Sequence, residues 1–456
     1  MDQIADDFIA PLRDDPRVIG YYCDNEIGWW DGALWRLTFA QAPTSRQRQR
    51  LIQLLRDTYE NDWDRLSKDF EPEGASNWQE LERGGRLWHR PGSNGLRVAR
   101  QFLGLMADRY YQLMRELIRK HDPDALYFGD RYQSFYYPEV ARACGRHVDV
   151  VSTNLNASWN DGTFLRSYLD TLHALTGKPI IASEFYMAAN ENRSGNKNSS
   201  SGFPTVATQR ERAAEMGNTV RALARLPYVV GAEWFQYYDE PPHGRFDGED
   251  YNFGLVDIHD QPYEEVTETF AALVPHKLKA AGVTALPDAS SGVPPAPADP
   301  LADFEFMRAL KSWDRERGFV PATSEYPTGD MYICWSPDAV YLAIYVLDVV
   351  DREHYRDGKV PAADRGQWQV QLGDAEPFTL RAGYGEAPKV SDTSLRFKSL
   401  SGVNHRLRSI AAVEIPAERL GTKRLKPGDR VELEASYVTH GSAHKIEWRG
   451  SFTLSE

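Results

Sequence analysis

Residues Val18 to Trp30 have the sequence VIGYYCDNEIGWW, which indicates the fold class. Its β-branched and aromatic beginning is typical of a strand, and it ends abruptly in three polar residues, Asp24, Asn25 and Glu26. In a parallel α/β barrel, reactive side chains lie where strands end and the following loops begin. The stretch therefore predicts a buried parallel strand with polar side chains at its carboxyl end.

Four more apolar runs follow before residue 280, and helical patterns separate them. The five expected strands cover residues 17–23, 125–129, 148–153, 179–183 and 228–235. The segments 97–121 and 209–226 place apolar residues along one stripe, as amphipathic helices do. Strands that alternate with helices predict a parallel sheet made of βαβ units.

Each of the later runs also ends in polar or aromatic residues. The candidates for a site after these runs are Asp130, Arg131, Asn154, Glu184, Trp234, Gln236, Tyr237 and Asp239. Glu26 and Glu184 each end a predicted strand beside aromatic residues. Glycoside hydrolysis needs two such acids, one protonated for the leaving oxygen and one ionised for attack at the anomeric carbon. A strand-end cap or a salt-bridge partner is the alternative for each acid.

The bulk composition excludes several classes of partner. The chain has 456 residues and a net charge of −13, which argues against nucleic acid or anionic membranes as partners. Its three cysteines lie far apart and predict neither a disulfide framework nor a zinc site. No apolar run reaches about 18 residues, and no basic segment precedes an apolar one near Met1. Export cannot be read from this chain, whose localisation is unknown and which, as it stands, is expected in the cytoplasm.

The composition changes near Thr284. Residues 284–300 are rich in Pro, Ala, Ser and Gly and predict a linker. Residues 301–456 contain strand-like runs separated by turn residues, without long helices, and predict a β-sandwich. We therefore expect an α/β domain over residues 1–283 and an all-β domain after the linker.

Residues 16–280 resemble the catalytic (β/α)8 barrel (TIM barrel) of clan A glycoside hydrolases. The resemblance is strongest to the β-agarase family and, next to it, to β-galactosidases with an Asn-Glu signature. It rests on GYYCDNEIGWW, which resembles the strand-four motif, and on PIIASEFYM, which resembles the strand-seven motif. It implies Glu26 as acid/base, Glu184 as nucleophile, Asn25 on the sugar 2-hydroxyl and Trp234 beneath the sugar. The other six candidates would bind substrate.

The resemblance implies a retaining β-glycoside hydrolase that acts on galactose-containing oligo- or polysaccharides and needs no metal or organic cofactor. It also implies three βα units before the Asn-Glu motif, where only 17 residues precede Val18. We therefore expect an incomplete barrel of strands four to eight. A second copy or another chain could cover its edges, the chain could derive from a split or truncated gene, or the sheet could be rearranged. A truncated, non-catalytic carbohydrate-binding protein is the alternative function.

Aromatic residues in two other regions carry open alternatives. The four tryptophans of residues 31–97 could plug the open side of the barrel or build sugar subsites. Residues 301–456 resemble a family-nine-like carbohydrate-binding module. Its candidate sugar-stacking residues, or else members of its core, are Trp335, Tyr341, Tyr345 and Trp368.

Overall fold

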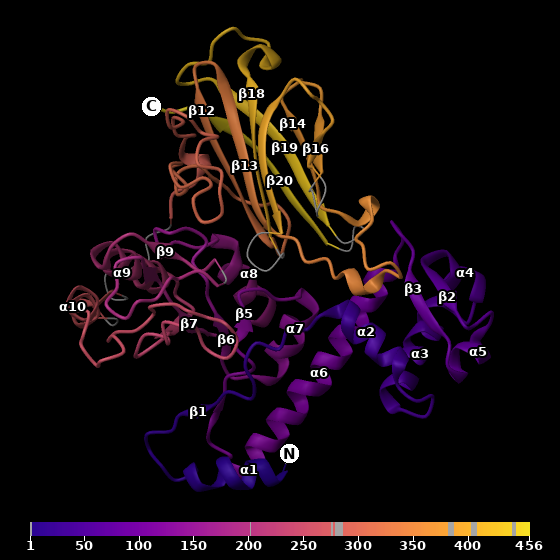
Figure 1. Ribbon diagram of the computed structural model, residues 1–456. Helices are drawn as coiled ribbons and strands as arrows, with labels where there is room; N and C mark the ends of the chain where they lie inside the picture. Colours follow the sequence, from indigo (N-terminus) through magenta and orange to yellow (C-terminus); the bar gives the residue numbers. More distant parts are fainter. Residues whose placement is uncertain are drawn as a thin grey trace.

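The computed structural model describes residues 2–200, 202–274, 277–278, 286–381, 387–402, 408–439 and 444–456. It has three regions: an α/β domain, a lobe of helices inserted into that domain, and a β-sandwich above it (Figure 1). The predicted boundary at residues 283 and 284 lies outside the described residues.

The α/β domain holds a row of parallel strands. The strands form two sheets, one of two strands and one of four, in which neighbours pair directly. A hydrogen bond from Asp149 N–H to the Tyr127 carbonyl (2.9 Å) joins the two sheets. All five predicted strands are confirmed, in the parallel direction. In order, the strands are β1 (Gly20–Tyr21), β4 (Leu126–Tyr127) with its continuation β5 (Tyr132–Gln133), β6 (Val151–Asn154), β7 (Ile180–Phe185) and β10 (Val229–Trp234).

Helices connect these strands. The predicted helices over residues 97–121 and 209–226 are confirmed as α6 and α9, and a capping box between Thr208 and Glu211 begins α9. A minor parallel pair, β8 (Ala188–Ala189) and β9 (Thr205–Val206), lies between β7 and α9. The helices are α1 (Asp2–Phe8), the 3-10 turn η1 (Ala10–Leu12), α6 (Gly95–His121), α7 (Pro138–His147), α8 (Arg166–Thr176), α9 (Gln209–Arg225) and α10 (Glu264–Ala272).

Residues 31–97 form the helical lobe, which projects away from the parallel strands (Figure 1). Trp35 and Trp78 are buried in the lobe's own core, Trp63 packs edge-on against Trp78, and Trp88 donates to Glu73 (2.7 Å). These tryptophans therefore neither plug the barrel nor line its strand ends. The lobe consists of α2 (Asp31–Ala40), α3 (Arg46–Tyr59), α4 (Trp63–Asp69), β2 (Phe70–Glu73), α5 (Trp78–Arg83) and β3 (Arg86–His89).

The predicted β-sandwich is confirmed as two packed antiparallel sheets. One sheet has the order β11 (Phe319–Val320), β12 (Gly329–Ser336), β13 (Ala339–Leu347), β18 (Arg408–Pro416) and β17 (Arg396–Gly402). The other has the order β16 (Lys389–Val390), β15 (Phe378–Arg381), β14 (Gln367–Leu372), β19 (Arg430–Thr439) and β20 (His444–Thr453). Short 3-10 turns complete the region: η2 (Ala289–Ser291), η3 (Arg352–His354), η4 (Ala362–Asp364) and η5 (Ala417–Leu420).

The described part of the expected linker belongs to the sandwich. Ala289 and Val293 are fully buried in the sandwich core, and Val293 N–H donates to the Thr453 carbonyl (2.8 Å). The four aromatic residues offered as sugar platforms also lie in cores. Their exposed fractions are 6% for Trp335, 8% for Tyr341 and 0% for both Tyr345 and Trp368. The reading as core residues therefore holds, because Trp335 and Trp368 belong to the sandwich core, and Tyr341 and Tyr345 belong to the cluster that the sandwich shares with the α/β domain.

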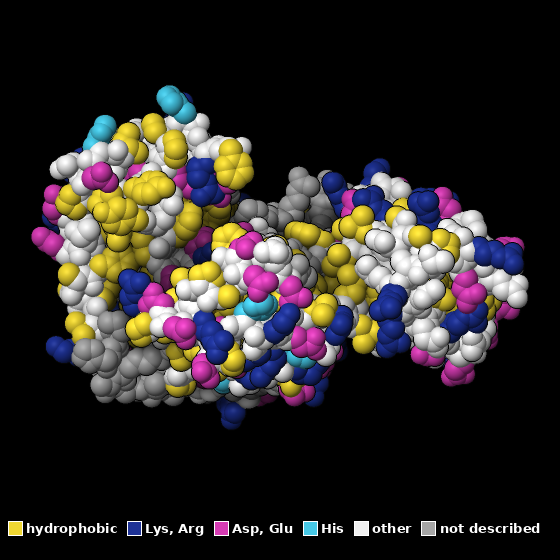
Figure 2. Space-filling model, turned by 90° about the horizontal axis from the view of Figure 1, so that it is seen from below, with side chains coloured by type: hydrophobic (Ala, Val, Ile, Leu, Met, Phe, Trp, Pro, Cys, Tyr) yellow, Lys and Arg dark blue, Asp and Glu magenta, His cyan; other side chains and the backbone are white. Residues whose placement is uncertain are grey.

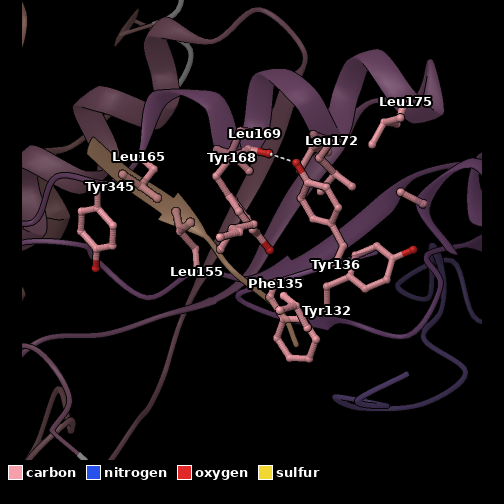
Figure 3. Close-up of a cluster of buried hydrophobic side chains, with 14 of the residues drawn as sticks. Tyr132, Phe135, Tyr136, Leu155, Leu165, Tyr168, Leu169, Leu172, Leu175 and Tyr345 are labelled. Carbon is pink, nitrogen blue, oxygen red and sulfur yellow. Dashed lines mark hydrogen bonds between the residues drawn. The ribbon is translucent and has the colours of Figure 1, made fainter. Parts of the chain in front are cut away.

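The sandwich packs on the α/β domain through the second face of β12, β13 and β18. Tyr345 contacts Trp159 edge-on (centroids 5.4 Å apart), and the buried Asp330 carboxylate accepts the backbone N–H groups of Arg166 and Ser167 at the start of α8 (2.7 and 2.9 Å). Figure 3 shows Tyr345 in one cluster with side chains of α8 and the neighbouring strands. The sandwich is thus a fixed part of the same body.

Among the described residues, β1 and β10 each pair with a strand on one side only. Ile19 beside β1 is 67% exposed and Val230 on β10 is 61% exposed, so apolar side chains face solvent at both edges. Figure 2 shows a band of hydrophobic side chains on the left of the molecule, where Figure 1 places β7, α9 and α10. A hydrogen bond from the Tyr22 hydroxyl to Glu233 (2.6 Å) links the two edges. In the described part of the chain, every helix is too short or too polar to cross a bilayer.

Candidate active site

Glu26 lies directly after β1, where the backbone turns sharply. Its φ is +56°, in the left-handed region, and its N–H donates to the carbonyls of Asp130 and Arg131 (3.1 and 3.2 Å). Arg131 has φ +49° on the neighbouring strand end. Non-glycine residues in this region cost free energy and cluster at functional sites. The two turns aim adjacent side chains at the same place.

Asn154, at the end of β6, holds the two predicted acids together. Its amide nitrogen donates to Glu26 Oε1 (2.7 Å) and to Glu184 Oε2 (3.2 Å). Because both oxygens accept from one nitrogen, they are separated by no more than the two bonds laid end to end, 5.9 Å. Glu26 and Glu184, which are remote in sequence, thus converge at one edge of the sheet.

The Arg131 guanidinium forms the other side of this cluster. One terminal nitrogen donates to Asn25 Oδ1 (2.9 Å), and the other donates to the Ser183 carbonyl (2.6 Å) and Glu184 Oε2 (3.2 Å). The guanidinium also lies over the Tyr22 ring, 5.5 Å from its centroid. Arg131 therefore fixes Asn25 and Glu184 relative to each other.

Burial and the neighbouring charges shift the protonation of Glu184. Burial, and next the negative charge of Glu26, raise the pKa of Glu184 to about 7, and the Arg131 guanidinium opposes this rise. The Glu249 carboxylate adds to the rise and the Arg245 guanidinium opposes it. Glu184 therefore exchanges a proton near neutral pH, as an acid or nucleophile in hydrolysis can.

The loop after β10 contributes those last two groups. Arg245 is bonded to Glu249 (2.7 Å), to Asp247 (2.7 Å) and to the buried Glu240 (3.3 Å). Arg245 also lies 5.8 Å from the centroid of Phe235, which packs near Tyr186, two residues beyond Glu184. This loop is therefore braced internally and faces the acid pair.

Two predicted substrate ligands lie in the protein interior instead. Asp130 is 1% exposed, and its two oxygens accept from the Trp29 indole and the Tyr111 hydroxyl (both 2.7 Å). Asp239 is also 1% exposed and accepts from Ser194, Tyr263 and the Gly254 N–H. Both carboxylates accept hydrogen bonds from protein groups inside the fold and do not face solvent. The expectation that they contact sugar is therefore corrected.

The remaining candidates lie in β10 or just after it. Trp234 packs against Phe185 and Phe270, and its indole donates to the Phe253 carbonyl (2.9 Å), on the side of β10 opposite to Glu233. Trp234 therefore packs under helices α9 and α10 rather than beneath a sugar. Gln236 is half-buried beyond the strand, and Tyr237 is 63% exposed beside it.

Sequence reasoning missed Ser183 and Tyr22. The Ser183 hydroxyl donates to Asn154 Oδ1 (3.0 Å), which turns the Asn154 NH₂ group toward the two acids. Tyr22 supports Arg131 and binds Glu233. The sequence pattern could have identified Tyr22, because residues 22, 24 and 26 would lie on the same side of an extended chain. The described residues hold no group of three or more His, Cys, Asp or Glu side chains that could bind a metal.

A parallel sheet that brings two carboxylates together at its strand ends is the architecture of α/β glycoside hydrolases. No family model matches the sequence. Beta-agarase B of Vibrio sp. (strain JT0107) is 30% identical over 268 residues, which are 56% of this chain and 27% of that protein. Beta-agarase A of the same strain is 28% identical over 273 residues, which are 55% of this chain and 26% of that protein. This chain is related to the β-agarases.

A solved structure agrees with these matches. The crystal structure of an agarase, AgWH50C, superimposes with a TM-score of 0.50 and 27% identity, over 58% of this chain and 38% of that one. The chain spans about a quarter of the length of the curated relatives and about two fifths of this structure. The predicted relation to β-agarases is confirmed.

Proposed function

We propose that this chain carries the catalytic pair of a retaining β-glycoside hydrolase that acts on galactose-containing oligo- or polysaccharides, on the strands of a (β/α)8-type barrel. The bridge that Asn154 makes between Glu26 and Glu184 carries the proposal. Carboxyl groups about 5–5.5 Å apart belong to retaining enzymes, and those about 6.5–9.5 Å apart to inverting ones. The 5.9 Å limit on the bridged oxygens favours retention. The names of the relatives support galactans as substrate.

In this proposal the Glu184 carboxylate attacks the anomeric carbon while Glu26 protonates the leaving oxygen. Glu26 then removes a proton from water, which attacks the glycosyl-enzyme and releases the product. Asn154 holds both carboxyl groups in place, and Arg131 stabilises the ionised form of Glu184. Asn25, held by Arg131, binds the sugar 2-hydroxyl, and Gln236 and Tyr237, which follow β10, bind substrate.

Hydrolysis of agarose and of an aryl β-galactoside tests this assignment in the wild type, Glu184→Gln and Glu233→Gln. Glu233→Gln is the matched control, because Glu233 is also a glutamate at a neighbouring strand end. We expect a loss of at least about 10³-fold for Glu184→Gln and less than about tenfold for the control. Proton NMR of the first product should show retained anomeric configuration. Equal rates in all three proteins, or an inverted product, would contradict the proposal.

We also propose that a second polypeptide covers the exposed sheet edges at β1 and β10. A second copy of this chain is the first candidate. Ile19 and Val230, both largely exposed, support it. Solution mass by light scattering measures it, and a monomer at all concentrations would contradict self-association. The alternative of a non-catalytic carbohydrate-binding protein predicts saccharide binding without turnover in every variant.

A further inference from the structure

One side chain of the sandwich reaches the residues that lie behind the acid pair. Arg408 is the first residue of β18 and pairs with Leu347 at the end of the β13–β18 ladder. Its guanidinium donates from Nη2 to the carbonyl of Ser134 in the α/β domain (2.9 Å). Ser134 follows β5 directly, so the sandwich is bonded to the segment that joins β5 to α7.

Ser134 in turn holds the backbone of Asn154. Its N–H (3.1 Å) and its hydroxyl (2.9 Å) both donate to the Asn154 carbonyl. Asn154 is the residue whose side-chain amide bridges Glu26 and Glu184. A continuous chain of hydrogen bonds and backbone therefore runs from the sandwich to both acids.

The residues of this chain are shielded from water. The exposed fractions are 4% for Arg408, 7% for Ser134 and 1% for Asn154. Water competes poorly for hydrogen bonds in such surroundings, where the low dielectric also strengthens them. Contiguous buried networks of this kind can carry energetic coupling between distant parts of a protein.

The backbone of Ser134 needs support from its surroundings. Its φ is +54°, in the left-handed region, and Arg131 on the same segment has φ +49°. A non-glycine residue held in this region costs about 1–3 kcal/mol and persists only where the surrounding contacts fix it. Arg408 supplies such a contact at the carbonyl of Ser134 itself.

Packing alone does not explain an arginine at this position. Removing a guanidinium from water costs free energy that an apolar side chain of similar length would not cost. The Tyr345 ring, whose centroid lies 5.9 Å from the guanidinium, offsets part of this cost. A residue that is costly to bury is typical of a place where function, and not packing, determines the side chain.

We infer that Arg408 is a positioning residue for the acid pair, acting through Ser134 and Asn154. The sandwich is then part of the site, because one of its side chains sets the place of the amide that bridges the two acids. The inference rests on the proposed function for its effect on the hydrolysis rate. Its effect on Asn154 is measured without substrate.

Arg408→Met in the full chain tests the inference, because methionine has a similar length and cannot donate to Ser134. The probe is the ¹⁵N-labelled side-chain amide of Asn154, which Asn154→Ala assigns. In the wild type its protons should exchange slowly with water, because the amide is buried and bonded to both acids. Arg408→Met should speed this exchange at least about tenfold.

The same variant should separate kcat from KM. For the aryl β-galactoside, kcat should fall about 10–100-fold, since a small displacement of the acids spoils their alignment. KM should change by less than about threefold, because Asn25 and its partner Arg131 are untouched. Arg408→Lys keeps a charged donor and should recover most of the lost kcat.

Asp330→Asn is the matched control for a weakened junction. Asp330 is also a buried residue of the sandwich that bonds the α/β domain, but it does so at the start of α8. Asp330→Asn should lower the stability of the protein and leave both the Asn154 exchange and kcat within about twofold of the wild type.

Two results would overturn the inference: wild-type exchange of the Asn154 amide in Arg408→Met, or an equal loss of kcat in Asp330→Asn. If Arg408→Met does not fold, Ser134→Ala carries the test, because it removes one donor to the Asn154 carbonyl inside the α/β domain. Unchanged amide exchange in that variant would also overturn the inference. If no variant hydrolyses substrate but the exchange responds to Arg408→Met and not to Asp330→Asn, the proposed function fails and this inference stands.

Discussion

The α/β domain and the sandwich use aromatic and polar residues in opposite ways. In the sandwich, Trp368 and Tyr345 lie within strands and are wholly buried, so their rings serve packing alone. In the α/β domain, Glu26 and Glu184 lie at strand ends and converge through Asn154. In this molecule, the position of a residue along its strand, more than its type, therefore determines whether it serves the candidate site or the packing. The interior of β13 is covered on both faces, whereas the ends of β1, β6 and β7 open onto loops.

Removal of the proposed acid at the end of β1 should give the largest of the effects predicted below. Glu26→Gln should lower agarose hydrolysis about 10²–10⁴-fold, because the alkoxide leaving group then receives no proton. An aryl galactoside with an acidic phenol needs little protonation, so its glycosylation step should fall much less, by under about tenfold. Burst-phase kinetics on both substrates measures the difference. An equal loss on the two substrates would show that Glu26 is not the acid.

The next effect lies in the sandwich. Trp368→Ala removes a wholly buried ring and should lower the free energy of unfolding by about 3–5 kcal/mol. The folded fraction should keep its affinity for saccharides, since the ring touches only the core. Chemical denaturation followed by tryptophan fluorescence measures the stability. Trp88→Ala on the helical lobe, where the ring is half-buried, is the control and should cost less. A selective loss of saccharide affinity in Trp368→Ala would restore its predicted role as a platform.

The raised pKa of Glu184 gives a smaller, pH-dependent effect. The pKa is about 7 in the folded chain against about 4.5 as the ordinary value, so the fold binds the proton more tightly than the unfolded chain does. This stabilisation is complete below about pH 4.5 and is lost as the pH rises through 7. Glu184→Gln should therefore become more stable than the wild type above pH 7, by up to about 3 kcal/mol.

Denaturation of both proteins at pH 5 and pH 8 measures this crossover, and a constant difference would contradict it. The rate carries the same information. A nucleophile must be ionised, and an aryl galactoside with an acidic phenol needs little protonation by Glu26, so kcat/KM for that substrate should rise with pH through about 7. Because the Glu26 charge contributes to the raised pKa, Glu26→Gln should move that limb to lower pH. A rate that falls as the pH rises through 7 would give Glu184 the acid role.

Most of the fold could be predicted from local patterns. Strand runs with polar ends, amphipathic helices and the shift of composition near residue 284 each depend on neighbouring residues alone. The relation to β-agarases likewise rested on short motifs around Glu26 and Glu184. The lobe of residues 31–97 was harder to predict from the sequence. Its helices and strands pack on one another to form a separate core, and the sequence pattern does not indicate which of them pair.

The details of the site depended on distant geometry. Asp130 and Arg131 are adjacent in sequence, yet one is buried and the other reaches the acids because the backbone turns to φ +49° at Arg131. Asn154 was expected to bind sugar, and its bridge arises from a register shift where β6 meets β7. Neighbouring residues of β10 point to opposite sides of the sheet. Glu233 points to the side where Tyr22 lies, so Trp234 faces the helices. The ends of predicted strands therefore identify the candidate residues, but they do not show to which side of the sheet each side chain points.

The smallest effect compares one hydroxyl in each region. Tyr22→Phe removes the single bond to the exposed Glu233 and keeps the ring beneath Arg131, so it should cost about 1 kcal/mol or less. Tyr437→Phe removes a hydroxyl that donates to Oδ2 of the buried Asp348 (2.8 Å), and although the Ser409 hydroxyl still donates to that oxygen (3.1 Å), the lost hydrogen bond to a buried carboxylate should cost about 1.5–3 kcal/mol. Denaturation under identical conditions compares them. If Tyr22→Phe costs as much as Tyr437→Phe, water does not reach the Tyr22–Glu233 bond, and the two regions are alike in being closed.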